Sequence, residues 1–168
     1  MNKILTLNNI SVAGLEKLPR DNYEIASEIQ NPDAILLRSF KMHEMDIPES
    51  LKAVGRAGAG VNNIPVDKMS EKGVVVFNAP GANANAVKEL VIAGMLMGCR
   101  NLGQAWDFAR NLEGTDEVIN KAVEAGKKDF GGFELPGRTL GVVGLGAIGR
   151  YVANAALDLG MKVIGFDP

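Results

Sequence analysis

A glycine-rich hexapeptide near the end of the sequence has a spacing that lets an anion approach the backbone. Residues 144–149 read G-L-G-A-I-G, with glycine at the first, third and sixth positions. Such a turn predicts a pyrophosphate site where a strand precedes it and a helix follows it. The apolar run 139–143 and the helical pattern 147–159 supply both elements. Asp167 follows Gly149 by 18 residues and ends a second apolar run, where its carboxylate would accept hydrogen bonds from a ribose.

Each position of this turn has its own expected role. Gly144 allows the tight bend out of the strand, Gly146 lets the pyrophosphate approach the backbone, and Gly149 lets the helix pack on the strand. The N–H groups of Ala147 and Ile148 start the helix and face the pyrophosphate. The carboxylate at the end of the second run would repel a 2′-phosphate, so we predict NAD rather than NADP as the cofactor.

Two arginines and a second glycine-rich loop form another set of residues that could bind an anion. Arg38 follows the apolar run 34–37, and Arg56 precedes the loop Ala57–Val61. Guanidinium groups bind phosphate and carboxylate, and glycines leave backbone N–H groups open to an anion. The pattern by itself is equally consistent with surface charges at strand ends. His43, the single histidine, lies in a polar segment typical of a solvated side chain, and we assign no catalytic residue and no metal ligand.

The elements around these residues alternate between strands and helices, which is typical of an α/β fold with a parallel sheet. The run 74–77 is continuously apolar, which favours a strand buried on both faces. The long helix 86–112 is apolar around most of its first half and is therefore expected to be buried on more than one side. Strands are expected at 3–7, 23–26, 34–37, 51–55, 74–77, 139–143 and 162–166, and helices at 12–18, 65–71, 86–112, 115–125 and 147–159.

Composition excludes several classes of protein. The 168 residues carry a net charge of −2, which argues against nucleic acid or a membrane surface as a partner. The 46% hydrophobic content supports a folded core. Cys99 is the only cysteine, so no internal disulfide forms, and we expect an inert buried thiol. No apolar run is long enough to span a bilayer. We expect a cytoplasmic protein.

Several motifs together resemble the D-2-hydroxyacid dehydrogenase family, and its phosphoglycerate branch in particular. The resemblance covers essentially the whole chain. It is carried by Arg56–Ile64, Phe77–Leu90, Glu134–Val143 running into the hexapeptide, and Gly160–Pro168.

The resemblance implies two domains and places the site residues. Residues 1–82 would form a flavodoxin-like substrate-binding domain without its C-terminal return segment. Residues 83–168 would form the first β-α-β unit of a Rossmann NAD-binding domain, truncated. The substrate phosphate and carboxylate would then be held by Arg38, Ser39, Arg56, Gly58, Ala59, Gly60 and Val61, with Ala59 also near the nicotinamide. NAD would be held by Gly144, Gly146, Ala147, Ile148, Gly149 and Asp167.

The activity implied by the resemblance is NAD-dependent oxidation of 3-phosphoglycerate, the entry to serine synthesis, in a homodimer or larger homo-oligomer. The family's catalytic Arg, Glu and His would lie beyond Pro168, so we expect the 168 residues to be an inactive N-terminal fragment. Two alternatives stay open: a non-catalytic NAD-sensing interaction protein of the same fold, and a dehydrogenase of another small 2-hydroxy acid.

Overall fold

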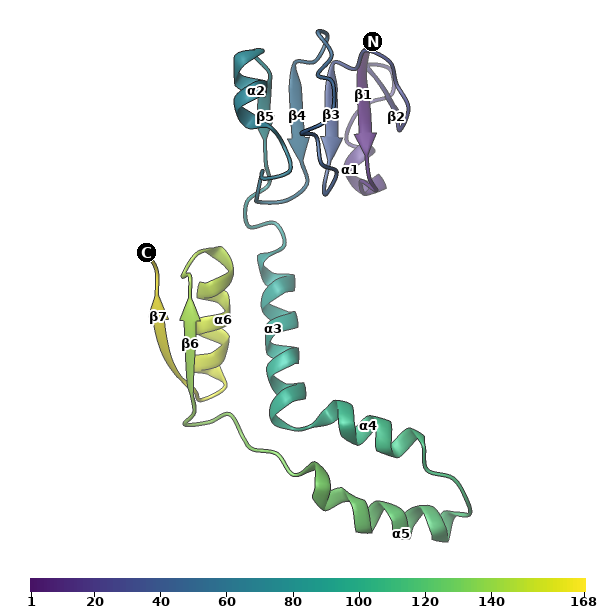
Figure 1. Ribbon diagram of the computed structural model, residues 1–168, viewed down its shortest axis with the longest axis vertical. Coiled ribbons are helices and arrows are strands. Elements are labelled where there is room, and N and C mark those ends of the chain that lie inside the picture. Colours follow the sequence, from purple (N-terminus) through teal and green to yellow (C-terminus); the bar gives the residue numbers. More distant parts are fainter. The chain divides into compact units, whose positions relative to one another are not determined.

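A computed structural model describes residues 1–168, which form two compact units, residues 1–82 and residues 83–168 (Figure 1). Each unit combines parallel strands with helices, so the α/β class predicted from the sequence is confirmed. No helix of the chain is both long and apolar enough to cross a membrane.

The first unit contains a five-stranded parallel sheet in the order β2-β1-β3-β4-β5. Neighbouring strands all pair in parallel, and β1, β3 and β4 point the same way in Figure 1. This order is that of flavodoxin-like sheets, and the direction of strand addition reverses between β1 and β3. The two helices of the unit are α1 (Val12–Leu15), which is shorter than expected, and α2 (Val66–Glu71). The strands are β1 (Asn2–Leu7), β2 (Tyr23–Ala26), β3 (Ala34–Leu37), β4 (Ala53–Arg56) and β5 (Val75–Phe77).

Strand β3 lies in the middle of this sheet and of its core. Ile35 pairs with Leu5 of β1 on one side and with Val54 of β4 on the other. Ile35 and Val54 are fully buried, and so is Met69 of α2, which packs into the same cluster. The face of β3 that carries Ile35 and Leu37 is therefore fully buried, whereas Ala34 and Leu36 on its other face are only partly buried.

The amino-terminal edge of this sheet is held by one carboxylate. Asp33 accepts a hydrogen bond from the Lys3 N–H at 2.9 Å and forms an ion pair with Lys52 Nζ at 2.7 Å. The hydrogen bond from Lys52 and then that from the Lys3 N–H lower the pKa of the Asp33 carboxyl. The charges of Asp33 and Lys52 at this edge are thus paired with each other.

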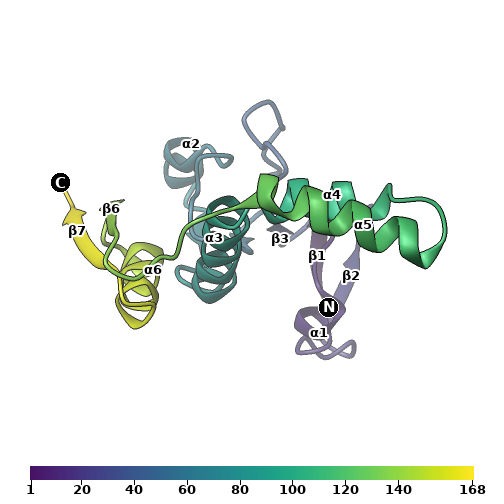
Figure 2. The ribbon, with the colours of Figure 1, turned by 90° about the horizontal axis from the view of Figure 1, so that it is seen from below.

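The second unit places α6 between a pair of parallel strands and α3 (Figures 1 and 2). In the strand pair, Leu140 of β6 lies opposite Val163 of β7. A small core gathers beneath α6 and includes Cys99, Ala156 and Met161. The elements are α3 (Ala84–Cys99), α4 (Leu102–Arg110), α5 (Asp116–Gly126), the 3₁₀ helix η1 (Lys127–Phe130), β6 (Thr139–Val143), α6 (Ala147–Asp158) and β7 (Lys162–Phe166).

The prediction of a single long helix at 86–112 is wrong, because the chain turns between α3 and α4. Asn101 adopts a left-handed conformation (φ 50°), which asparagine tolerates better than most residues. Its side-chain Nδ2 donates to the Gly131 carbonyl at 2.8 Å, and the Phe133 N–H donates to the Cys99 carbonyl at 2.9 Å. The connector after η1 therefore satisfies the end of α3. Gly98 and Gly103 flank this turn in the sequence, but the residue that takes the left-handed conformation is Asn101.

Two further predictions, both of burial, are wrong for this chain. Strand β5 buries only one face, because Val75 and Phe77 are 52% and 60% exposed. Helix α3 contacts α6 and α4 but leaves Leu90 73% exposed. The periodicity of apolar residues shows which faces of a helix or strand are apolar. It does not show whether a neighbouring element packs on those faces.

The core of the first unit makes a stability prediction. Met69→Ala removes a fully buried side chain and should lower the free energy of unfolding by about 2–5 kcal/mol. Lys68→Ala, on the exposed side of the same helix, should change it by less than about 0.5 kcal/mol. Urea unfolding followed by circular dichroism compares the two. Equal losses would mean that α2 does not pack on the sheet as described.

Candidate functional site

The carboxyl-terminal edge of the five-stranded sheet gathers the polar residues of the first unit. Asn8 follows β1, Arg38 follows β3, Arg56 ends β4 and Asn78 follows β5. Because the strands are parallel, all four side chains leave from one edge. Ligands of open α/β sheets bind outside this edge, where the strand order reverses. In this sheet that point lies between β1 and β3.

The two predicted arginines have no anionic partner in the chain. The ion pairs of the structure are Lys52–Asp33, Lys121–Glu117 and Lys127–Glu124. Arg56 Nε donates to the Arg38 carbonyl at 3.0 Å, which ties the end of β4 to the segment after β3. This bond leaves the terminal nitrogens of the Arg56 guanidinium and the whole guanidinium of Arg38 without a counter-ion. The carboxyl edge thus differs from the amino edge, where Asp33 and Lys52 pair.

The loop after Arg56 offers fewer backbone donors than its glycines suggested. The N–H groups of Ala57 and Gly58 already donate to backbone carbonyls of the unit, at 2.8 and 2.9 Å. Asn78 Nδ2 holds the loop by donating to the Ala59 carbonyl at 2.7 Å. A Cβ at position 58 would lie 2.6 Å from Nη1 of the flexible Arg56 side chain, so the absence of a side chain at Gly58 leaves room for the guanidinium. The N–H groups for which the structure records no acceptor are those of Ala59, Gly60 and Val61.

Three asparagines that the sequence analysis missed hold these loops in place. One is Asn78, and the other two bind the segment that follows β3. Asn8 Oδ1 accepts from the Ser39 and Phe40 N–H groups at 3.0 and 2.6 Å. Asn63 Nδ2 donates to the Arg38 and Phe40 carbonyls at 3.2 and 2.7 Å. Asn8 and Asn78 follow strand ends, where asparagine is a known turn former, so their positions were a signal. The partners of the three asparagines, however, lie 19 to 32 residues away in the chain.

In the second unit the hexapeptide forms the turn between β6 and α6. Gly144 has a φ of 93°, which a side chain would strain. A Cβ at Gly149 would overlap the carbonyl oxygen of Gly144, so helix and strand pack as closely as the spacing predicted. A Cβ at Gly146 would meet no atom within 4 Å. The fold therefore requires the first and last glycines, while the middle one borders open space.

The carboxylate of Asp167 lies against this turn. Its Oδ2 accepts a hydrogen bond from the Leu145 N–H at 2.6 Å, and no partner is recorded for Oδ1. Helix α6 starts after Gly146 with no side-chain cap. Its first-turn N–H groups, those of Ala147 and Ile148, have no acceptor within the helix. An exposed carboxylate and uncapped amide donors thus share one turn.

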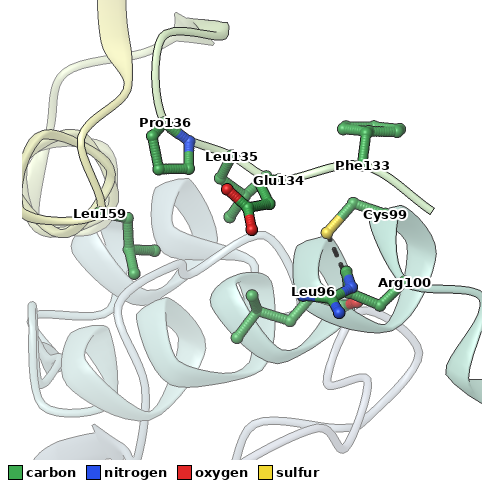
Figure 3. A pocket seen from close by; sticks show the side chains of 8 residues that line it. All are labelled: Leu96, Cys99, Arg100, Phe133, Glu134, Leu135, Pro136 and Leu159. Carbon is green, nitrogen blue, oxygen red and sulfur yellow. Dashed lines mark hydrogen bonds between the residues drawn. The ribbon is translucent and has the colours of Figure 1, made fainter.

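A cavity of about 220 Å³ lies elsewhere in the second unit (Figure 3). Cys99 lines it together with residues 133–136 of the connector and Leu159. The Cys99 thiol is buried and donates weakly to the Leu96 carbonyl at 3.6 Å, as expected for an inert thiol. His43 is exposed, and no cluster of three or more His, Cys, Asp or Glu side chains that could hold a metal occurs.

Comparison with known proteins gives concordant matches. Residues 4–159 match the family model for the catalytic domain of D-isomer specific 2-hydroxyacid dehydrogenases. The chain is 40% identical over 148 residues to a D-3-phosphoglycerate dehydrogenase of Methanocaldococcus jannaschii, which covers 86% of this chain. It is also 40% identical over 156 residues, 91% of this chain, to a hydroxypyruvate reductase of Thermotoga maritima.

Among solved structures, the chain matches the NAD⁺-bound 3-phosphoglycerate dehydrogenase of Entamoeba histolytica, with a TM-score of 0.71 and 27% identity over 99% of this chain. The chain spans only part of these relatives: 26% of the Methanocaldococcus protein, 47% of the Thermotoga protein and 54% of the Entamoeba chain.

The turn between β6 and α6 makes a prediction that needs no ligand. Gly149→Ala forces a Cβ onto a backbone carbonyl and should destabilise the second unit by about 1–3 kcal/mol or more. Gly146→Ala, with open space around it, should cost less than about 1 kcal/mol. Hydrogen exchange at the Val142 and Val163 amides measures both. Retained protection in Gly149→Ala would show that helix and strand are not in this contact.

Proposed function

The chain belongs to the D-isomer specific 2-hydroxyacid dehydrogenases, and on that premise we propose that the protein carrying it oxidises a phosphorylated D-2-hydroxy acid with NAD. The proposed substrate is 3-phosphoglycerate, and the product is 3-phosphohydroxypyruvate. The phosphoglycerate dehydrogenases among its relatives support this choice. The observation that carries it is the convergence of Arg38 and Arg56 at the carboxyl edge of the sheet, where Arg56 Nε donates to the Arg38 carbonyl and neither guanidinium has a counter-ion.

The substrate's two anionic groups match the two kinds of donor at this edge. Guanidinium groups bind phosphate through several parallel N–H bonds, so we assign the phosphate to Arg38 and Arg56. The carboxylate then takes the open backbone N–H groups of Ala59, Gly60 and Val61. The Ser39 N–H is already bound to Asn8, which leaves the Ser39 hydroxyl as the group that this residue can offer. Gly58 belongs to the site through the room that it gives Arg56.

The turn after β6 fits the pyrophosphate and adenosine ribose of NAD. The open face at Gly146 admits the pyrophosphate, and the uncapped first turn of α6 supplies its amide donors. Asp167 keeps Oδ1 for the ribose hydroxyls while the Leu145 N–H holds Oδ2. When bound, NAD supplies the hydride acceptor for oxidation of the substrate C2–H bond. The family likeness adds Ala59 as a neighbour of the nicotinamide.

The residues of this chain bind and orient the substrate, and we assign none of them to the proton transfer. Oxidation of the C2 hydroxyl also needs a base to take its proton. His43 is exposed, and the structure records no hydrogen bond to it, so nothing orients its imidazole for that role. Arg38, Arg56 and the loop amides instead fix the phosphate and the carboxylate on either side of the reacting carbon.

Removing an arginine should affect phosphorylated ligands selectively. Arg56→Ala or Arg38→Ala should raise the Kd for 3-phosphoglycerate roughly tenfold or more, since a charge-assisted contact is worth about 1.5–3 kcal/mol. The Kd for D-glycerate should change far less. Arg20→Ala, an exposed arginine before β2, serves as the control. Equal losses on both ligands would favour an unphosphorylated substrate, as in the Thermotoga hydroxypyruvate reductase.

Cofactor choice should depend on the charge of Asp167. Asp167→Asn keeps an oxygen to accept from the Leu145 N–H but removes the repulsion of a 2′-phosphate. The ratio of NADP to NAD affinity should therefore rise about tenfold, which corresponds to about 1.4 kcal/mol. Fluorescence titration with NADH and NADPH measures this ratio. An unchanged ratio would remove Asp167 from the ribose site.

A further inference from the structure

We propose that Asn8 is a positioning residue for the phosphate site: its carboxamide fixes the backbone that carries Arg38. This inference rests on the proposed function, because it concerns how the proposed site is held. Asn8 lies at the end of β1, directly across the strand-order reversal from the segment after β3.

The segment Arg38–Phe40 follows the last residue of β3 and has lost the ladder hydrogen bonds of the sheet. Side chains replace them. The N–H groups of Ser39 and Phe40 both donate to Asn8 Oδ1, and the carbonyls of Arg38 and Phe40 accept from Asn63 Nδ2. Backbone polar groups that find no internal partner turn to water and leave a loop free to move. This loop is held from both sides.

The Arg38 side chain depends on this arrangement more than Arg56 does. Arg56 is anchored by its own Nε bond to the Arg38 carbonyl. For the Arg38 guanidinium the structure records neither an ion pair nor a hydrogen bond within the chain. Its location is therefore set by where the backbone places its Cα, and that backbone is held at the two following N–H groups by Asn8.

The residue type at position 8 fits the task in two ways. Its φ of 71° is left-handed, a conformation that asparagine, aspartate and glycine accept more readily than other residues. Both N–H groups point at one oxygen, which fixes the orientation of the amide. An aspartate would accept the same bonds but would add a negative charge beside two arginines assigned to an anion. Asparagine supplies the acceptor without that charge.

The test compares two asparagines that share a backbone conformation. Asn8→Gly keeps the left-handed backbone without strain and removes only the carboxamide. Asn31→Gly is the matched control: Asn31 also has a positive φ (51°), lies before β3 at the opposite edge of the sheet, and has no side-chain hydrogen bond recorded. The 168-residue chain is titrated with 3-phosphoglycerate and with D-glycerate, and the amide signals of Ala59–Val61 are followed by NMR.

We expect Asn8→Gly to raise the Kd for 3-phosphoglycerate roughly tenfold, as loss of two hydrogen bonds that hold a binding loop would produce. Amide exchange at Ser39 and Phe40 should accelerate while exchange in β3 stays slow. Asn31→Gly should leave affinity and exchange unchanged. The Kd for D-glycerate should change little in either variant, because D-glycerate has no phosphate for Arg38 to bind. A general loss of folding would instead weaken the binding of both ligands alike.

Three outcomes overturn the inference, and they are distinguishable. If the unsubstituted chain binds neither ligand, the proposed substrate site fails and the role of Asn8 fails with it. If it binds 3-phosphoglycerate and Asn8→Gly binds equally well, only the role of Asn8 is wrong. If Asn8→Asp, which retains the acceptor oxygen, does not restore slow exchange at Ser39 and Phe40, the two hydrogen bonds are not what holds the segment.

Discussion

Parallel pairing of β1, β3 and β4 is the constraint on which the proposed substrate site depends. The carboxyl ends of parallel strands lie at the same edge of a sheet. Residues that are far apart in the sequence therefore come together there, although no sequence motif marks the site. The order β2-β1-β3-β4-β5 then opens a gap in the chain's crossovers between β1 and β3. Asn8 and Arg38 lie on either side of that gap, and Arg56 lies at the end of β4, the next strand of the sheet.

The two edges of the same sheet differ in how their charged groups are paired. At the amino edge, Asp33 accepts a hydrogen bond from the Lys3 backbone N–H and forms an ion pair with the Lys52 side chain. At the carboxyl edge, hydrogen bonds from asparagines satisfy the backbone, and the guanidinium charges are left without partners. Neutral carboxamides can hold loops without cancelling the field that an anion would feel. Asn63 and Asn78 must be amides because both donate to backbone carbonyls, which a carboxylate cannot do. Asn8 acts as an acceptor, and there the amide avoids the negative charge that an aspartate would add.

In the second unit, the glycine turn proposed for NAD leaves backbone N–H groups next to open space. The fold requires two glycines of the turn: Gly144 bends the chain, and Gly149 lets the helix pack on the strand. The third, Gly146, borders open space. The Leu145 N–H donates to Asp167, so the carboxylate is fixed against the turn before any ligand binds. Such preorganisation lowers the entropic cost of binding.

The sequence by itself determined the α/β class, most of the strands and the glycine turn with Asp167, because these follow from short apolar runs and from local backbone requirements. It also pointed to Arg38 and Arg56 as strand-end cations. Only the tertiary structure decided that the Ala57 N–H already donates to the Leu37 carbonyl, that α3 ends before Asn101, and that Asn8 binds the Ser39 N–H. These outcomes depend on hydrogen-bond partners 20 to 34 residues away in the chain, and a hydrogen bond between distant loops leaves no periodicity in the sequence.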